Sequence, residues 1–150
     1  MAKIIAVSKS KSKGTRKEAV AEGNFREGYG LLEDAHADYG THRQVSFLAI
    51  ESIKKMQAKG FSVGPGDFAE NLTTEGIDLV SLPVGTQVSI GKDVIMEITQ
   101  IGKECHVGCA IFQQTGKCIM PKEGVFARVV RSGVIKAGNM IKVLPDRGNS

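Results

Sequence analysis

The sequence predicts a mainly β protein with one or two helices, folded as a closed or nearly closed β-barrel. Short stretches in which apolar and polar residues alternate recur along the chain, and this period of two is typical of strands with one buried face. The 150 residues include 18 glycines, which indicates many tight turns. Because closure removes exposed strand edges, a barrel is a favourable arrangement for many short strands.

The predicted strands follow one another with turn residues between them. They are Lys3–Ser8, Thr86–Ile90, Val94–Ile98, Val125–Val130 and Met140–Leu144. The turn Gly91-Lys92-Asp93 separates the second from the third, which predicts an antiparallel hairpin. Val94, Met96 and Ile98 would share one face and Glu97 would lie on the other, since successive side chains of a strand point to opposite faces.

One segment, Ala49–Lys59, has the pattern of a helix. Ile50, Ile53 and Met56 recur at helical spacing, so they form one apolar side. We expect this helix to cover one opening of the barrel. A second, short helix is predicted over Val107–Gln114.

Length and composition indicate one domain, residues 1–145, followed by a short C-terminal tail, residues 146–150. A compact domain of this length buries about 68–70% of the surface of its unfolded chain, which is enough for one continuous core. The three cysteines are an odd number, so a fully paired disulfide framework is excluded and a cytoplasmic location is expected. No apolar run approaches the roughly 20 residues that span a bilayer, so no membrane partner is expected.

The formal net charge is +4, and six basic residues precede the first acidic residue, Glu18. This concentration of positive charge favours small anions or phosphates as ligands. The chain lacks the aromatic stacking pairs and the strong basicity typical of nucleic-acid binding, so nucleic acid is not expected as a partner.

Cys105 is the strongest candidate for a reactive residue, because it follows a strand-like run and the polar turn Gly102-Lys103-Glu104, where a thiol can face a cleft. An ordinary cysteine has a pKa of about 8.5, and a neighbouring cation such as a lysine lowers it and increases the thiolate fraction. Two other interpretations stay open. Cys105 could be a small buried apolar group, or it could bind a structural metal with His106, Cys109 and Cys118, although the spacing matches no common zinc pattern.

The segment Gly64–Gly76 is rich in glycine and polar side chains, and two interpretations of it stay open. Asp67 and Asn71 can cap turns through their own side chains and Glu70 can accept hydrogen bonds from backbone N–H groups, which would make the segment architectural. Alternatively, the amide of Asn71 and the hydroxyls of Thr73 and Thr74 suit a polar heterocycle and a phosphate, which would make it part of a ligand site.

A third polar cluster covers Glu33–Gln44 and contains mixed charges. Arg43 is a candidate phosphate ligand, because a guanidinium can bind phosphate through two parallel hydrogen bonds. His36 is a second candidate site residue, although a single histidine is more often a hydrogen-bonded structural residue.

These segments, taken in order, resemble the MOSC domain family, named for the C-terminal domain of molybdenum cofactor sulfurase. The most specific element is the run Gly66-Asp67-Phe68-Ala69-Glu70-Asn71-Leu72-Thr73. The other elements are the Lys13-Gly14 turn, the segment with Asp34-Ala35-His36 and Arg43, Cys105, and the closing Val125–Gly133. The chain is most similar to the small standalone bacterial members of the family.

The resemblance implies a β-barrel related to the barrel domain of pyruvate kinase, and a site for the pterin-bound molybdenum cofactor. Cys105 takes the position of the cysteine that either carries persulfide sulfur or coordinates molybdenum. The residues that match the family's cofactor-binding positions are Lys13, Arg16, His36, Arg43, Asn71, Thr73 and Arg128. The implied partners are cofactor-synthesis proteins, together with a cysteine desulfurase or an electron-transfer protein.

Three functions follow as expectations. The first is binding and delivery of the molybdenum cofactor or its sulfur through Cys105. The second is a molybdenum-dependent reductase of N-hydroxylated compounds, against which the stretch Gln100–Glu104 argues, since such members carry a Pro- and Arg-rich stretch there. The third is a noncatalytic anion-binding or interaction module. Larger members add a pyridoxal-phosphate-dependent desulfurase domain, for which 150 residues leave no room.

Overall fold

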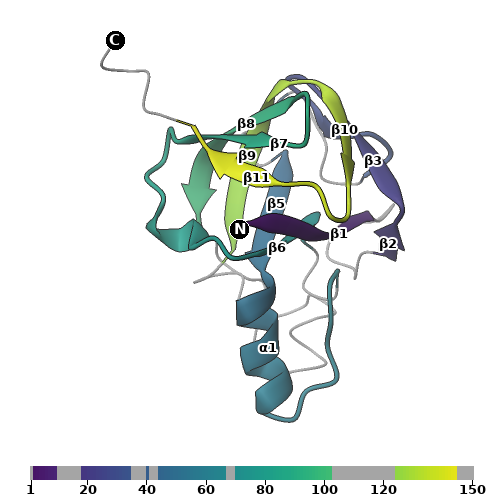
Figure 1. Ribbon diagram of the computed structural model, residues 1–150, viewed down its shortest axis with the longest axis vertical. Coiled ribbons are helices and arrows are strands. Elements are labelled where there is room, and N and C mark those ends of the chain that lie inside the picture. The colour runs from purple at the N-terminus through teal and green to yellow at the C-terminus, as the bar shows by residue number, and fades with distance from the viewer. Residues whose placement is uncertain are drawn as a thin grey trace.

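Strands make up most of the described chain, as the alternating pattern predicted. The computed structural model of the protein describes residues 2–9, 18–34, 40, 44–66, 70–102 and 124–144. The strands are β1 (Lys3–Lys9), β2 (Glu18–Val20), β3 (Glu22–Arg26), β4 (Gly30–Leu31), β5 (Val45–Ala49), β6 (Leu72–Glu75), β7 (Gln87–Ile90), β8 (Val94–Ile101), β9 (Val125–Arg131), β10 (Gly133–Lys136) and β11 (Ile141–Val143). The helices in these ranges are α1 (Ile50–Ala58), labelled in Figure 1, and the short 3-10 helix η1 (Leu79–Ser81).

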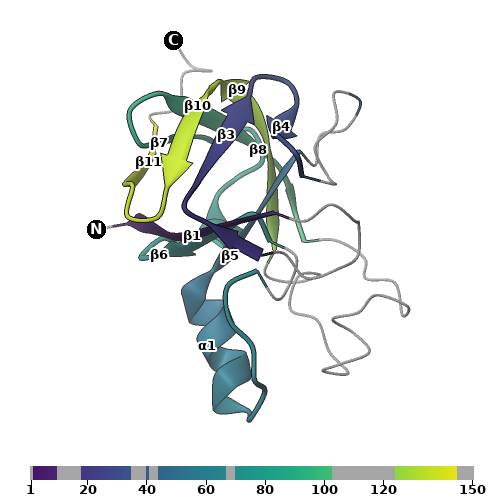
Figure 2. The same cartoon turned by 90° about the vertical axis from the view of Figure 1, so that its right-hand side faces the viewer.

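The strands form two sheets that enclose the main core. One sheet has eight strands in the order β11-β7-β8-β9-β5-β6-β1-β2, and the other has three in the order β10-β3-β4. Figure 2 shows β10 and β3 side by side next to β1. Phe25 and Leu31 of the smaller sheet are buried in the same core as Phe47 and Leu72 of the larger one. We call the face of the larger sheet that points away from this core its outer face.

The hairpin of β7 and β8 confirms the prediction from sequence alternation. The strands pair antiparallel with Ile90 opposite Val94 across the predicted turn. Val94, Met96 and Ile98 are fully buried in the main core, while Glu97 lies on the outer face, partly exposed. The next pair, β8 with β9, is also antiparallel and extends this part of the sheet.

The helix α1 begins directly after β5 and confirms the predicted helix to within one residue at each end. Its buried residues Ile53 and Met56 pack with Leu48 of β5 and Phe126 of β9, in a second cluster that is separate from the main core. Leu48 and Phe126 alternate with core residues along their strands, so the buried side of α1 packs with residues of the outer face, and Figure 1 shows the helix extending from the end of β5. The prediction that α1 covers a barrel opening is not confirmed, because the described strands form two open sheets. No helix in the described part of the chain is both long and apolar enough to cross a membrane.

The predicted closure into a barrel is not confirmed, because the strands remain in two open sheets. One isolated antiparallel bridge, Lys3 with Met140, brings β1 close to the segment that leads into β11. The backbone of Ile4 adds two hydrogen bonds there, donating to Asn139 O at 2.8 Å and accepting from Gly138 N at 2.7 Å. β1 and the segment before β11, which lie near opposite ends of the large sheet, therefore meet through a short contact and not through a continuous ladder of hydrogen bonds.

The most consequential difference from the sequence prediction is β6, which lies inside the segment Gly64–Gly76. It pairs parallel with β5, with Leu72 opposite Phe47, and antiparallel with β1, with Leu72 opposite Val7. Part of this segment, for which the alternation pattern predicted no strand, is therefore an internal strand of the large sheet. Its threonines are β-branched and suit an extended backbone, but their polarity and the flanking glycines hid the strand from the alternation pattern.

Candidate functional site

The structure describes three of the eight predicted site residues, namely Asn71, Thr73 and Arg128. The other five lie outside the described residues and keep their roles as predictions: Lys13, Arg16, His36, Arg43 and Cys105. The alternative metal ligands and the predicted second helix also lie outside them, and so does the predicted C-terminal tail.

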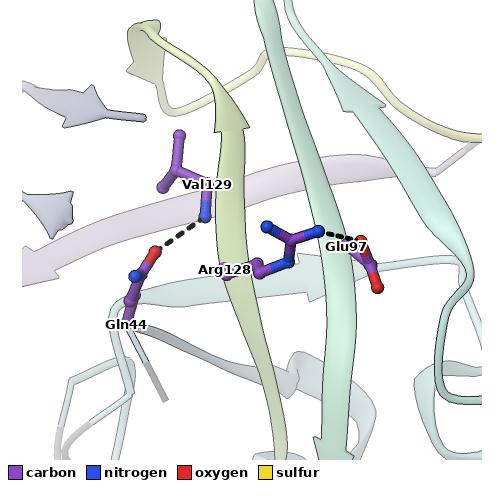
Figure 3. Close-up of polar contacts among 4 residues, drawn as sticks. All are labelled: Gln44, Glu97, Arg128 and Val129. Carbon is purple, nitrogen blue, oxygen red and sulfur yellow. Dashed lines mark hydrogen bonds and ion pairs between the residues drawn. The ribbon is translucent and has the colours of Figure 1, made fainter. Parts of the chain in front are cut away.

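Arg128 lies on β9 with its side chain on the outer face of the sheet. The neighbouring Ala127 and Val129 are buried in the main core, so alternation along the strand directs Arg128 outward. Its guanidinium Nη2 donates to Glu97 Oε1 across the β8–β9 pair, with the two atoms 2.6 Å apart (Figure 3). The Arg128 side chain is 50% exposed and that of Glu97 is 25% exposed. This arrangement places a solvent-accessible guanidinium beside a carboxylate.

Gln44 is a buried polar residue, bonded to the backbone of β9 next to Arg128, that the sequence did not point to. Its side chain is 4% exposed. Its Oε1 accepts a hydrogen bond from Val129 N at 3.0 Å, and its Nε2 donates to Gly28 O at 2.7 Å. Figure 3 shows Gln44 on the side of β9 opposite to Glu97. The only sequence signal was its place next to Arg43, immediately before the apolar run that begins at Val45.

Asn71 lies fully buried on the outer face, where β1, β5 and β6 meet. Its Oδ1 accepts hydrogen bonds from Ser46 N at 3.0 Å and from Ser46 Oγ at 3.2 Å. Its Nδ2 donates to Ser8 O at 3.1 Å. These bonds join three strands, so Asn71 has a framework role, and its predicted contact with a cofactor stays a prediction.

Thr73 and Glu70 form the neighbouring part of this buried polar group. Glu70 Oε2 accepts hydrogen bonds from Thr73 Oγ1 at 2.9 Å and from Gly66 N at 2.8 Å. The bond from Gly66 confirms the expectation that Glu70 accepts from the backbone of its own segment. Both side chains are fully buried, and the hydroxyl of Thr73 is directed to Glu70. These contacts favour the architectural interpretation of the segment at Glu70 and Thr73.

Comparison with known proteins identifies the family. A sequence model described as the MOSC domain matches residues 34–142. The chain belongs to the MOSC domain family. The match includes Arg128, Asn71 and Thr73, and the predicted resemblance is thereby confirmed. Domains of this family are associated with binding of the molybdenum cofactor.

Solved structures agree with the MOSC fold. The YuaD protein of Bacillus subtilis superposes with a TM-score of 0.79 and 19% identity, over 95% of this chain and 96% of its own. YiiM of Geobacillus stearothermophilus gives a TM-score of 0.75 and 19% identity, over 97% of this chain and 76% of its own. YiiM of Escherichia coli gives a TM-score of 0.68 and 18% identity, over 96% and 70%. A comparison with curated proteins gave no significant match.

Among the residues that the structure describes, no three His, Cys, Asp or Glu side chains come together as a metal site. A cavity of about 590 Å³ lies between α1 and the segment that follows β6, and Gly76 N donates to Glu51 Oε2 at its edge, at 3.0 Å. It is lined by Ala49, Glu51, Ser52, Lys55 and Gly76–Val80. Of the predicted site residues that the structure describes, Asn71, Thr73 and Arg128 do not line it.

Proposed function

We propose that this MOSC domain binds the molybdenum cofactor, with Arg128 as one of the residues that hold the cofactor's phosphate and Cys105 as the residue that carries sulfur or binds the metal. The observation that carries the proposal is the half-exposed side chain of Arg128 on the outer face of β9, within the region that matches the family. The match gives the class of ligand, and Arg128 offers a group that suits its phosphate.

Arg128 has the capacity to bind an anion. A guanidinium has five N–H donors in a planar fork that matches the oxygens of phosphate. One Nη2 donates to Glu97, and Arg128 has no other partner among the described residues. Half of the Arg128 side chain is exposed. Charged hydrogen bonds of this kind contribute on the order of 1.5–3 kcal/mol each.

Asn71 and Thr73 suit the framework of the site better than direct contact with the cofactor, because both are fully buried and bonded to other parts of the chain. We assign the remaining contacts with phosphate and pterin to Lys13, Arg16, His36 and Arg43. Their cationic or polar side chains are the appropriate partners for a dianionic phosphate and a polar heterocycle.

Cys105 has two chemical roles open to it. When bound, the cofactor supplies a molybdenum centre capable of oxygen- or sulfur-transfer chemistry, and a thiolate is a suitable ligand for it. As a sulfur carrier, the Cys105 thiolate would attack the outer sulfur of a persulfide on a cysteine desulfurase. The S–S bond of the donor breaks, the donor cysteine leaves as a thiolate, and Cys105 becomes the persulfide with no net oxidation.

Metal analysis tests the proposal. The wild-type protein and the variants Arg128→Ala, Cys105→Ser and Cys109→Ser would be purified from cells that make the cofactor, and their molybdenum and pterin contents compared. We expect Arg128→Ala to lose pterin and molybdenum together, and Cys109→Ser to match the wild type. Equal molybdenum in Cys105→Ser and wild type would exclude metal binding by this thiol. Absence of pterin from the wild type would refute the proposal of tight cofactor binding.

Mass spectrometry distinguishes the sulfur-carrying role. After incubation with a cysteine desulfurase and cysteine, we expect a gain of about 32 Da, one sulfur atom, on Cys105 and not on Cys109. A peptide without that gain would exclude persulfide transfer. Turnover of an N-hydroxylated compound with an electron donor, lost in Cys105→Ser, would instead establish the reductase.

A further inference from the structure

We infer that Gln44 is the positioning residue of the anion site, because its side-chain amide fixes the backbone of β9 next to Arg128. The inference rests on the proposed function and adds a residue that determines how well Arg128 presents its guanidinium to a phosphate. Gln44 would not touch the ligand. It would act indirectly, by fixing the position of the backbone from which the Arg128 side chain extends.

Three hydrogen bonds connect Gln44, Gly28 and Val129 in a closed ring. Val129 N donates to Gln44 Oε1 at 3.0 Å, Gln44 Nε2 donates to Gly28 O at 2.7 Å, and Gly28 N donates to Val129 O at 2.9 Å. Both backbone polar groups of Val129 are therefore engaged outside the regular strand ladder. Gly28 lies in the turn between β3 and β4, so the ring also joins the small sheet to the large one.

This ring fixes one side of Arg128, and the strand ladder fixes the other. Ala127 pairs with Val45 of β5, and Arg128 itself is opposite Glu97 of β8. With its two neighbours held in this way, the backbone of Arg128 has little freedom to shift. The direction of the guanidinium is then set mainly by its own side-chain rotamer. Binding an anion through two parallel hydrogen bonds requires the backbone of the arginine to be fixed, because the groups of a prearranged site must be held to within about 0.5 Å.

Glutamine is well suited to this position. Its amide supplies one acceptor for Val129 N and one donor for Gly28 O at the end of a single flexible side chain. Glutamate would keep the acceptor and lose the donor, while methionine has a similar length with neither group. At 4% exposure, loss of the amide would leave the N–H of Val129 and the carbonyl of Gly28 without their partner in a place that water reaches poorly.

Gln44 also follows Arg43 in the sequence, and Arg43 is another predicted phosphate ligand. Arg43 lies outside the described residues, and its role as a phosphate ligand stays a prediction. The ligand class remains a phosphate group presented by a small molecule.

The test is a titration with inorganic phosphate, followed by NMR of the arginine and glutamine side chains in four proteins: wild type, Gln44→Met, Arg128→Ala and the double variant. We expect Arg128→Ala to weaken phosphate binding about 10-fold or more, as for the loss of a charged hydrogen bond. Gln44→Met should weaken it about 5-fold, and the double variant should bind no more weakly than Arg128→Ala alone. This non-additivity is the signature of action through Arg128.

Gln57→Met is the matched control. Gln57 Nε2 donates to Val63 O at 2.7 Å, so this variant also removes a side-chain to backbone bond, but one that joins α1 to the segment after it rather than to the backbone of β9. It should leave phosphate affinity unchanged. Gln44→Met with wild-type affinity, or effects of Gln44→Met and Arg128→Ala that add, would overturn the inference. Absence of phosphate binding by the wild type would instead count against the phosphate contact in the proposed function.

If Gln44→Met does not fold, the NMR spectra of the wild-type protein during the phosphate titration test the inference instead. The side-chain amide protons of Gln44 should shift with the same dissociation constant as the guanidinium Nε–H of Arg128, since the two are mechanically linked. Amide protons of Gln44 that stay unchanged while those of Arg128 move would overturn the inference.

Discussion

Two polar regions on the outer face of the large sheet differ in how their hydrogen-bonding groups are used. Around Asn71, the side chains are fully buried and bonded to other strands of the protein. At Arg128, half of the side chain is exposed and a single carboxylate is its partner among the described residues. A specific polar motif can therefore serve to hold the strands together, while a single arginine on a nearby strand keeps the capacity to bind a ligand.

The largest expected effect separates the two regions by stability. Asn71→Ala removes the hydrogen bonds to Ser46 and Ser8 and leaves buried groups unsatisfied, so we expect it to lower the free energy of unfolding by about 2–4 kcal/mol. Arg128→Ala removes an exposed ion pair and should cost less than about 1 kcal/mol. Urea unfolding of both variants measures the difference. Equal stability of the two would contradict the division into a framework and a ligand-binding region.

A second prediction compares two adjacent threonines of β6 that are both fully buried. The hydroxyl of Thr73 donates to Glu70, whereas that of Thr74 has no partner in the described ranges. Thr73→Val should therefore destabilise the protein by about 1–3 kcal/mol, because Glu70 loses a donor. Thr74→Val should stabilise it by about 1 kcal/mol, since it removes a buried unsatisfied hydroxyl. Thermal unfolding should give a lower melting temperature for Thr73→Val and a higher one for Thr74→Val. A change in the same direction for both variants would reject this explanation.

The smallest expected effect concerns affinity at Arg128. Glu97 accepts from the same guanidinium that we propose binds phosphate, so the carboxylate competes with the ligand. Glu97→Gln should raise phosphate affinity about threefold, within the modest strength of exposed ion pairs. Glu75→Gln is the control, because it removes the same charge from an exposed pair with Lys3, 3.6 Å across, away from Arg128. An equal gain in both variants would mean that net charge, and not competition at Arg128, controls the affinity.

The sequence predicted the elements whose signals are local. The hairpin of β7 and β8 followed from strict alternation around a short turn, and α1 followed from apolar residues at helical spacing. The family followed from the run that ends in Asn71-Leu72-Thr73. Each of these signals lies within about a dozen neighbouring residues, where side-chain periodicity reports directly on burial.

The remaining features depend on partners that are distant in the chain. Asn71 bonds to Ser8, 63 residues away, and Gln44 bonds to Val129, 85 residues away. Nothing in the neighbourhood of either residue specifies these partners, because strand order and register decide them. For the same reason the sequence could predict many short strands but not whether their sheet closes into the expected barrel, and it gave no signal for polar β6, which lies between β5 and β1.

The bridge between Lys3 and Met140 has a consequence for biosynthesis. Chains emerge from the ribosome at about 5–20 residues per second, so β1 is released several seconds before the segment that joins it to β11. During that interval the edge of β1 that pairs with Met140 has no partner strand from this bridge. A nascent chain arrested before Met140 should therefore be captured by chaperones more readily than the released protein.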